Sequence, residues 1–113
     1  MVNPGQSIDP AKLAQELSER GIGWADANAA AEALAETKGT VLAQLAADYL
    51  GKGESAAKAE LLAKAHPDYT AHLEKMVAAR KAANRARVRY DVYKAYIELA
   101  RSHEASRRQE MKL

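Results

Sequence analysis

Hydrophobic residues recur along this chain at steps of three and four, the spacing that places residues on one face of an α-helix. The longest early series follows a heptad pattern with small residues in its first half, which is typical of helices that pack along their lengths. Its members are Trp24, Ala27, Ala31, Leu34, Lys38, Val41, Leu45 and Asp48. Alanine and other strong helix formers fill most remaining positions, so the pattern predicts an all-α fold.

Capping residues and glycines predict where the first two helices begin and end. Asp9-Pro10 is a good helix start, and Gly21-Ile22-Gly23 predicts a turn, so the first helix should cover about 10–20. A second helix should cover about 24–50. Gly39 lies inside it and costs about 1 kcal/mol relative to alanine, which makes a kink possible there.

The second half of the chain predicts one short helix and one very long helix. Ser55 can cap a helix over 56–65, and Pro67 is well placed to begin a helix that continues to about 110. At 1.5 Å per residue the last helix would be about 65 Å long. We therefore expect an antiparallel helical hairpin or coiled coil with one very long C-terminal helix. Residues 1–8 would form a flexible leader, and 9–113 a single helical domain.

A helix of this length needs a partner along its length, because an alanine-rich surface gains little by itself. The second helix is too short to cover the segment around 90–99, so either the helix over 10–20 folds back over it or another chain does. We expect a homo-oligomer, with an isologous dimer favoured. The residues expected to support self-association are Tyr90, Val92, Tyr93, Tyr96, Ile97, Leu99, Trp24, Leu34, Val41 and Leu45.

Composition and motifs exclude several kinds of catalytic and metal site. The 113 residues include 26 alanines and one tryptophan but neither phenylalanine nor cysteine, so the core should be thin and thiolate sites are excluded. His66, His72 and His103 form no metal-binding pattern, and no nucleophile or phosphate-loop motif occurs. We expect a cytoplasmic protein that is not an enzyme, needs no cofactor or metal and does not enter a membrane.

Charge is distributed unevenly. Residues 1–65 carry 6 Lys or Arg and 9 Asp or Glu, a net charge of −3, whereas residues 66–113 carry 11 and 6, a net charge of +5. Lys81, Arg85 and Arg89 align at steps of four on a helix, and like charges at this spacing repel one another. Their acidic counterpart is either the second helix, through Asp26, Glu32, Glu36 and Asp48, or a second subunit, or nucleic acid phosphate. The candidate surface consists of Arg80, Lys81, Arg85, Arg87, Arg89 and Tyr90.

The second half of the chain resembles a group of small alanine-rich helical proteins encoded by tailed phages and prophages. The resemblance covers residues 55–113. It lies in the order of a short helix at 60–65, a break at His66-Pro67-Asp68-Tyr69, the segment 79–86 and the C-terminal segment 98–113. This resemblance implies a role in phage recombination or early functions, in DNA metabolism or host takeover, with no catalytic residues to transfer.

Three functions compete at this point. The first is a non-catalytic binding protein of phage DNA metabolism that contacts single-stranded DNA or a phage or host recombination protein. The second is an oligomeric adaptor or inhibitor of a host enzyme without nucleic-acid contact, in which the long helix is the working surface. The third is a structural coiled-coil component of a virion.

Overall fold

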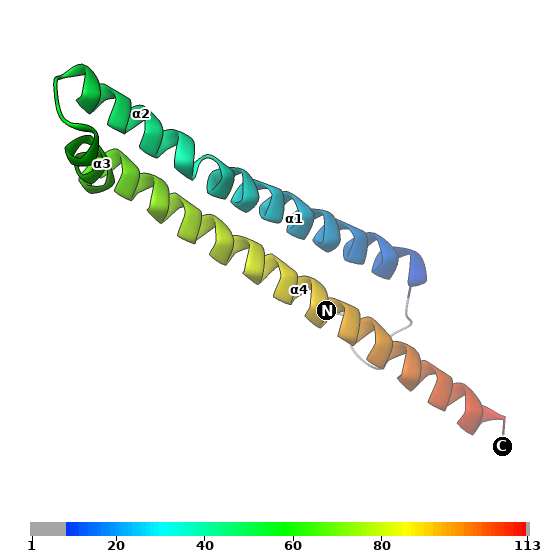
Figure 1. The fold of residues 1–113 in the computed structure, drawn as a ribbon. Helices are drawn as coiled ribbons and strands as arrows, with labels where there is room; N and C mark the ends of the chain where they lie inside the picture. The colour runs from blue at the N-terminus through cyan, green and yellow to red at the C-terminus, as the bar shows by residue number, and fades with distance from the viewer. Residues whose placement is uncertain (1–8, 113) are drawn as a thin grey trace.

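The protein is a long helical hairpin in the computed structural model, which describes residues 9–112 (Figure 1). Its four helices are α1 (Pro10–Glu36), α2 (Lys38–Gly51), α3 (Ala56–Ala65) and α4 (Pro67–Met111), with no strand among the described residues. α1 and α2 follow one another along α4 and run antiparallel to it, while α3 lies at the end where the chain turns back. The all-α hairpin with one very long C-terminal helix is therefore confirmed. The leader predicted over 1–8 lies outside the described residues.

The hairpin is a thin rod of 86 × 18 × 16 Å with a radius of gyration of 24.2 Å. A compact domain of this length would have a radius of gyration of about 13 Å. Within residues 9–112, no helix is both long enough and apolar enough to cross a membrane. The shape leaves most of each helix surface outside the hairpin.

The predicted turn at Gly21-Ile22-Gly23 is wrong, because α1 continues through it as one helix of 27 residues. The predicted helices over 10–20 and 24–50 are therefore replaced by α1 and α2. The physical reason is the series that faces α4, which keeps its steps of four and three across both glycines. Packing along this series outweighs the helix propensity cost of about 1 kcal/mol for each glycine. The series consists of Leu13, Leu17, Arg20, Trp24, Ala27, Ala31 and Leu34, all buried or half-buried.

Gly21 supports close packing rather than a turn. A Cβ atom at this position would lie 3.3 Å from Cε2 of Tyr90, tighter than ordinary van der Waals contact. The same atom at Gly23 would meet nothing within 4 Å. Glycine at position 21 therefore allows α1 to lie close against the Tyr90 ring.

The actual break in the first arm lies at Thr37, between α1 and α2. The Thr37 hydroxyl lies 3.1 Å from the carbonyl oxygens of both Ala33 and Leu34, the local bonding that competes with regular helix. From α4, Nε2 of His72 donates a hydrogen bond of 2.8 Å to the Leu34 carbonyl oxygen. Gly39, where a kink was considered possible, lies inside α2. The break is thus held from both helices.

The caps predicted at Asp9 and Ser55 are present, and the predicted start at Pro67 is capped by His66. Asp9 accepts hydrogen bonds from the backbone N–H groups of Ala11 and Lys12 at 3.0 and 3.4 Å, and Ser55 accepts one at 3.3 Å from Lys58. His66 precedes Pro67 in extended conformation and caps α4 through its Nδ1 atom. These local bonds satisfy N–H groups that the first turn of a helix leaves free.

An alanine and tyrosine core joins the two arms. Ala31 and Ala83 are 3% and 1% exposed, and Tyr93 is 9% exposed. We call the facing residues of both helices the inner seam: the α1 series given above and a second series on α4, every member of which is buried or half-buried. The α4 members are Tyr69, His72, Met76, Ala79, Ala83, Ala86, Tyr90, Tyr93, Ile97, Ala100 and Glu104. Their unbroken steps of three and four give coiled-coil packing.

Candidate functional site

The basic segment of α4 divides into three parts that face in different directions. Arg80 turns toward α1, where its Nη1 atom donates a hydrogen bond of 2.9 Å to Oδ1 of Asn28. Arg87 lies 3.8 Å from the Asp91 carboxylate, and its guanidinium is 5.8 Å from the centre of the Trp24 ring. These two cations therefore each contact α1 from α4.

Tyr90 belongs to the inner seam. Its ring is half-buried, with its centre 5.6 Å from the centre of the Trp24 ring. This tilted packing of two rings is a favourable aromatic geometry. Since α1 covers Tyr90, its ring is not presented beside the cations as a platform for a nucleic acid base.

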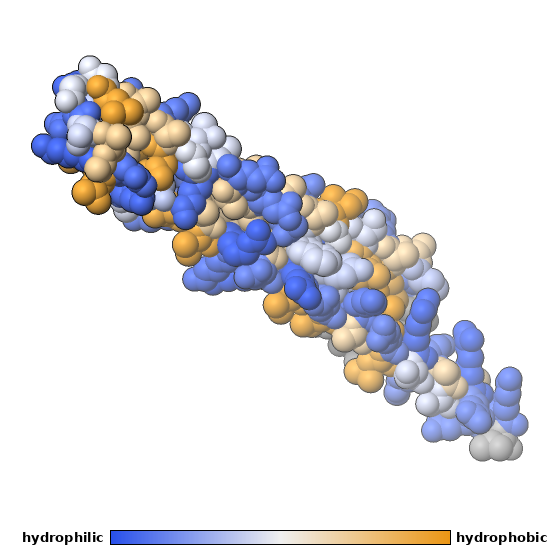
Figure 2. Space-filling view, in the orientation of Figure 1, coloured by the Kyte–Doolittle hydropathy of each residue, from blue (hydrophilic) through white to orange (hydrophobic). Residues whose placement is uncertain are grey.

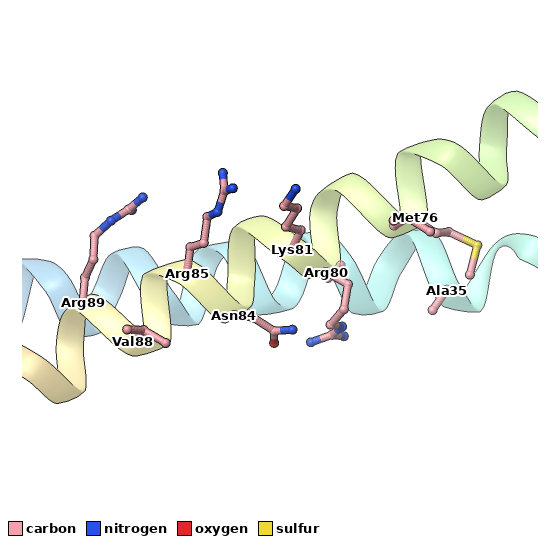
Figure 3. Close-up of a pocket in the computed structure, with 10 residues that line it drawn as sticks. Ala35, Met76, Arg80, Lys81, Asn84, Arg85, Val88 and Arg89 are labelled. Carbon is pink, nitrogen blue, oxygen red and sulfur yellow. The ribbon is translucent and has the colours of Figure 1, made fainter.

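The remaining cations, Lys81, Arg85 and Arg89, are exposed and point to one side of α4 (Figure 3). Eight residues separate the first from the last, about 12 Å along the helix axis. Among the described residues, none of the three makes a side-chain hydrogen bond or an ion pair. They form a cationic surface without a partner in this chain.

The acidic residues of the first arm do not neutralise this surface. Across residues 9–112, Asp26, Glu32, Glu36 and Asp48 form no ion pair with the basic segment. Glu32 accepts a hydrogen bond from Asn28, and Asp26 and Glu36 are exposed on the side of α1 away from its inner seam. The internal match considered from the sequence is therefore not formed, because these acids and the cations at 81, 85 and 89 are exposed and lie outside the inner seam.

Apolar side chains accompany the cations. Val88 and Val92 are each 59% exposed, and Leu99 is 71% exposed. With Lys81 and Arg85 they form a second series at steps of three and four, which we call the α4 outer stripe and beside which Arg89 lies. Its members are Ala78, Lys81, Arg85, Val88, Val92, Ala95 and Leu99, all exposed. The space-filling view likewise shows apolar patches among hydrophilic ones along the rod (Figure 2).

An open groove of about 870 Å³ lies in the middle of this region. Lys81, Arg85 and Val88 line it together with Val77, which is 69% exposed, and it extends to Ala35 on α1. The groove thus offers apolar surface flanked by positive charge. Ligand sites of this composition orient a partner through few polar groups and gain affinity from apolar contact.

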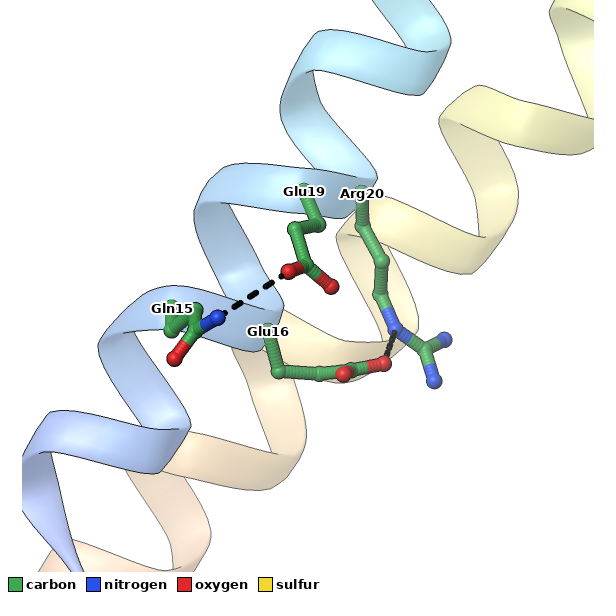
Figure 4. A network of polar contacts seen from close by, with 4 residues as sticks. All are labelled: Gln15, Glu16, Glu19 and Arg20. Atoms are coloured by element: carbon green, nitrogen blue, oxygen red, sulfur yellow. Dashed lines mark hydrogen bonds and ion pairs between the residues drawn. The ribbon is translucent and has the colours of Figure 1, made fainter.

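The tyrosines predicted to support self-association are largely used within the chain. Tyr93 is buried against α1, where the Arg20 guanidinium lies 4.5 Å from the centre of its ring. Burial, and then the nearby Glu16 carboxylate, raise the pKa of Tyr93 above its ordinary value of 10.0. The Nε atom of Arg20 in turn donates a hydrogen bond of 2.9 Å to Oε1 of Glu16 (Figure 4). Of the two coverings considered for this segment, the chain's own residues 10–20 provide it, although they do so as part of the continuous α1 rather than by folding back.

The other residues predicted to support self-association divide into covered and exposed groups. Trp24, Leu34 and Ile97 lie in the inner seam, and Val41 and Leu45 are half-buried on α2. Tyr96 is half-buried, with its ring centre 5.9 Å from that of Tyr93. Only Val92 and Leu99 are exposed among the ten residues of that prediction. The sequence did not separate these two groups, although their heptad positions differ.

A second cavity, of about 470 Å³, lies where the beginning of α1 meets the end of α4. Leu13, Leu17 and Ile97 contribute its apolar lining, and Lys94 and Arg101 are among its charged residues. Over residues 9–112, no three metal-ligating side chains gather in a group that could hold an ion.

Comparison of the chain with known protein families, with curated proteins and with solved structures finds no match.

Proposed function

We propose that this protein is a non-catalytic adaptor that binds an acidic amphipathic helix of a protein partner along the α4 outer stripe. The observation that supports it most is the exposed cationic surface of Lys81, Arg85 and Arg89, which has no partner within residues 9–112. Like charges at this spacing repel one another. An acidic partner would relieve this repulsion while making new contacts.

The apolar members of the stripe favour a protein helix over nucleic acid. Val88 and Val92 lie beside the cations and are more than half exposed. A phosphate backbone gains little from such side chains, whereas an amphipathic helix places apolar residues on them at the same three-and-four spacing. Single-stranded nucleic acid binding would use stacking aromatics, and Tyr90 packs against Trp24 instead.

The affinity would come mainly from apolar contact, and specificity from charge. Exposed ion pairs contribute about 0–1 kcal/mol each, and burying apolar surface contributes about 25 cal/mol per Å². The resemblance of residues 55–113 to phage proteins of the recombination or early region suggests a partner in DNA metabolism or host takeover. This biological setting is an additional proposal and rests on the resemblance alone.

The test uses two fluorescent helical peptides with the same apolar heptad series, one flanked by glutamates and the other by lysines. Anisotropy titrations with the full chain should show binding of the acidic peptide and at least tenfold weaker binding of the basic one, a difference of about 1.4 kcal/mol. Raising salt from about 50 mM to 300 mM should weaken the acidic complex, because screening shortens the reach of the charges.

Variants identify the surface. The triple variant K81A/R85A/R89A should lose at least tenfold in affinity for the acidic peptide, about 1.4 kcal/mol. R101A/R107A/R108A, which removes three cations further along α4, is the matched control and should bind as the original chain does. Equal binding of both peptides would contradict the proposal. Preferential binding of an oligothymidylate, with a salt slope of about −2 for three phosphate contacts, would support the nucleic acid alternative instead.

A further inference from the structure

The outer face of α1 carries a stripe that complements the α4 outer stripe. Its members also follow steps of three and four, and we call them the α1 outer stripe. They are Glu19, Ile22, Asp26, Ala29, Ala33 and Glu36, all exposed. Ile22 is 59% exposed although it is a large aliphatic residue. α1 therefore has one apolar series facing α4 and a second, acidic series facing away from its inner seam.

The acids of this stripe have no cationic partner within the described residues. Glu19 accepts a hydrogen bond of 3.3 Å from the neutral amide of Gln15, whereas nearby Glu16 is paired with Arg20 (Figure 4). Asp26 and Glu36 make no side-chain hydrogen bond or ion pair over the same range. The α1 outer stripe thus has three carboxylates without a cationic partner, and the α4 outer stripe has cations without an acidic one, among the described residues.

We infer that the α1 outer stripe of a second copy of this chain occupies the α4 outer stripe. The two stripes share the three-and-four spacing of coiled-coil helices, carry opposite charge and expose aliphatic residues, and complementary charges set the choice of partner in such pairs. In this contact, Ile22 of one copy packs near Val88 and Val92 of the other, and Asp26 and Glu19 approach the cations. The inference deepens the proposed function, on which it rests, by naming the acidic helix.

The geometry of this contact decides the kind of assembly. Each copy uses α4 to bind and α1 to be bound, so the interface joins two different surfaces and is heterologous. Such interfaces close into rings or continue as open stacks, because every added copy still presents one free stripe. An isologous dimer through residues 90–99, as expected from the sequence, is replaced by this arrangement, since α1 already covers Tyr90 and Tyr93.

Charge reversal on each stripe tests the contact with the full chain. Sedimentation velocity at about 50 mM salt, where charges are weakly screened, should show species that grow with concentration. K81E/R85E/R89E and E19K/D26K/E36K should each shift this association to at least tenfold higher concentration, about 1.4 kcal/mol. An equimolar mixture of the two variants should associate again, because the unchanged acidic stripe of the first variant can bind the unchanged cationic stripe of the second.

A matched control distinguishes the effect of the α4 cations in the contact from the effect of the chain's net charge. R101E/R107E/R108E changes the net charge from +2 to −4, as K81E/R85E/R89E does, since each reverses three cations. It should associate as the original chain does. Circular dichroism of each variant checks that the helices remain, which is expected because all the stripe positions are exposed.

Cysteine cross-linking tests the pairing without altering charge, and the chain has no cysteine of its own. Mixed under mild oxidation, Ile22→Cys should form a disulfide-linked pair with Val88→Cys or Val92→Cys, and Leu61→Cys, exposed on α3, should not. A monomer at every concentration, an unrestored mixture, or equal cross-linking to Leu61→Cys would overturn the inference. If the acidic peptide still bound in that case, the proposed function would stand and only the second copy as occupant would fail.

Discussion

Tyr93 and Val92 are neighbours in α4, yet one belongs to the inner seam and the other to the α4 outer stripe. Tyr93 is 9% exposed and packs under Arg20 of α1, while Val92 is 59% exposed. The inner seam and the α4 outer stripe follow the same three-and-four spacing, so periodicity alone does not tell which of the two is covered. The difference lies in what accompanies the apolar residues. Small, aliphatic and aromatic residues make up most of the inner seam, whose one cation, Arg20, is paired with Glu16, whereas the cations of the α4 outer stripe have no partner among the described residues.

The largest expected effect comes from a charge placed in the inner seam. Ala83→Glu should destabilise the hairpin by several kcal/mol, because an unpaired carboxylate would be buried beside α1. Ala82→Glu, one residue away and exposed, should leave the melting temperature nearly unchanged. Thermal unfolding followed by circular dichroism makes the comparison. Equal melting temperatures for the two variants would mean that the seam is not closed in solution.

Truncation of the two neighbours should separate stability from association. Tyr93→Ala should cost about 3 kcal/mol of unfolding free energy, since it removes a buried ring and leaves a cavity. Val92→Ala should cost at most about 0.5 kcal/mol, as surface substitutions usually do. Urea unfolding at low protein concentration measures both. A cost for Val92→Ala similar to that for Tyr93→Ala would show that both faces of α4 are covered within one chain.

The two glycines of α1 provide a finer comparison. Gly23→Ala should stabilise the chain by about 1 kcal/mol through helix propensity, because the added Cβ meets nothing within 4 Å. Gly21→Ala should gain less, since its Cβ would lie 3.3 Å from the Tyr90 ring. Urea unfolding of both variants checks this order. An equal gain at both positions would show that α1 does not approach Tyr90 so closely.

The smallest expected effect is on the free energy of unfolding at alkaline pH. Because burial raises the pKa of Tyr93, the folded state favours its neutral form, and this stability is fully present below the unfolded value of 10.0. It should be lost as pH rises through the higher folded pKa. Tyr93→Phe should reduce the loss of stability as the pH rises above 10.0. An unchanged alkaline profile in Tyr93→Phe would argue against burial of this hydroxyl.

Part of the first arm could have been predicted correctly from the sequence. The steps from Leu17 to Arg20 and on to Trp24 preserve the heptad register across Gly21 and Gly23. That register indicates one continuous helix, and packing along it outweighs the local tendency of glycine to end helices. The break at Thr37 had no comparable signal. Besides the local bonds of Thr37, it involves a hydrogen bond to Leu34 from His72, which lies 38 residues away.

The sequence by itself determined the helical class, the capped starts at Asp9, Ser55 and Pro67, and the great length of α4, because these follow from local propensity and spacing. Only the tertiary structure decided which cations pair and which aromatic rings are covered. That choice depends on the rotation of α1 against α4, which places Trp24 on Tyr90 and leaves Lys81, Arg85 and Arg89 outside. Packing of the inner seam sets this rotation, and the rotation in turn determines which charged side chains are exposed.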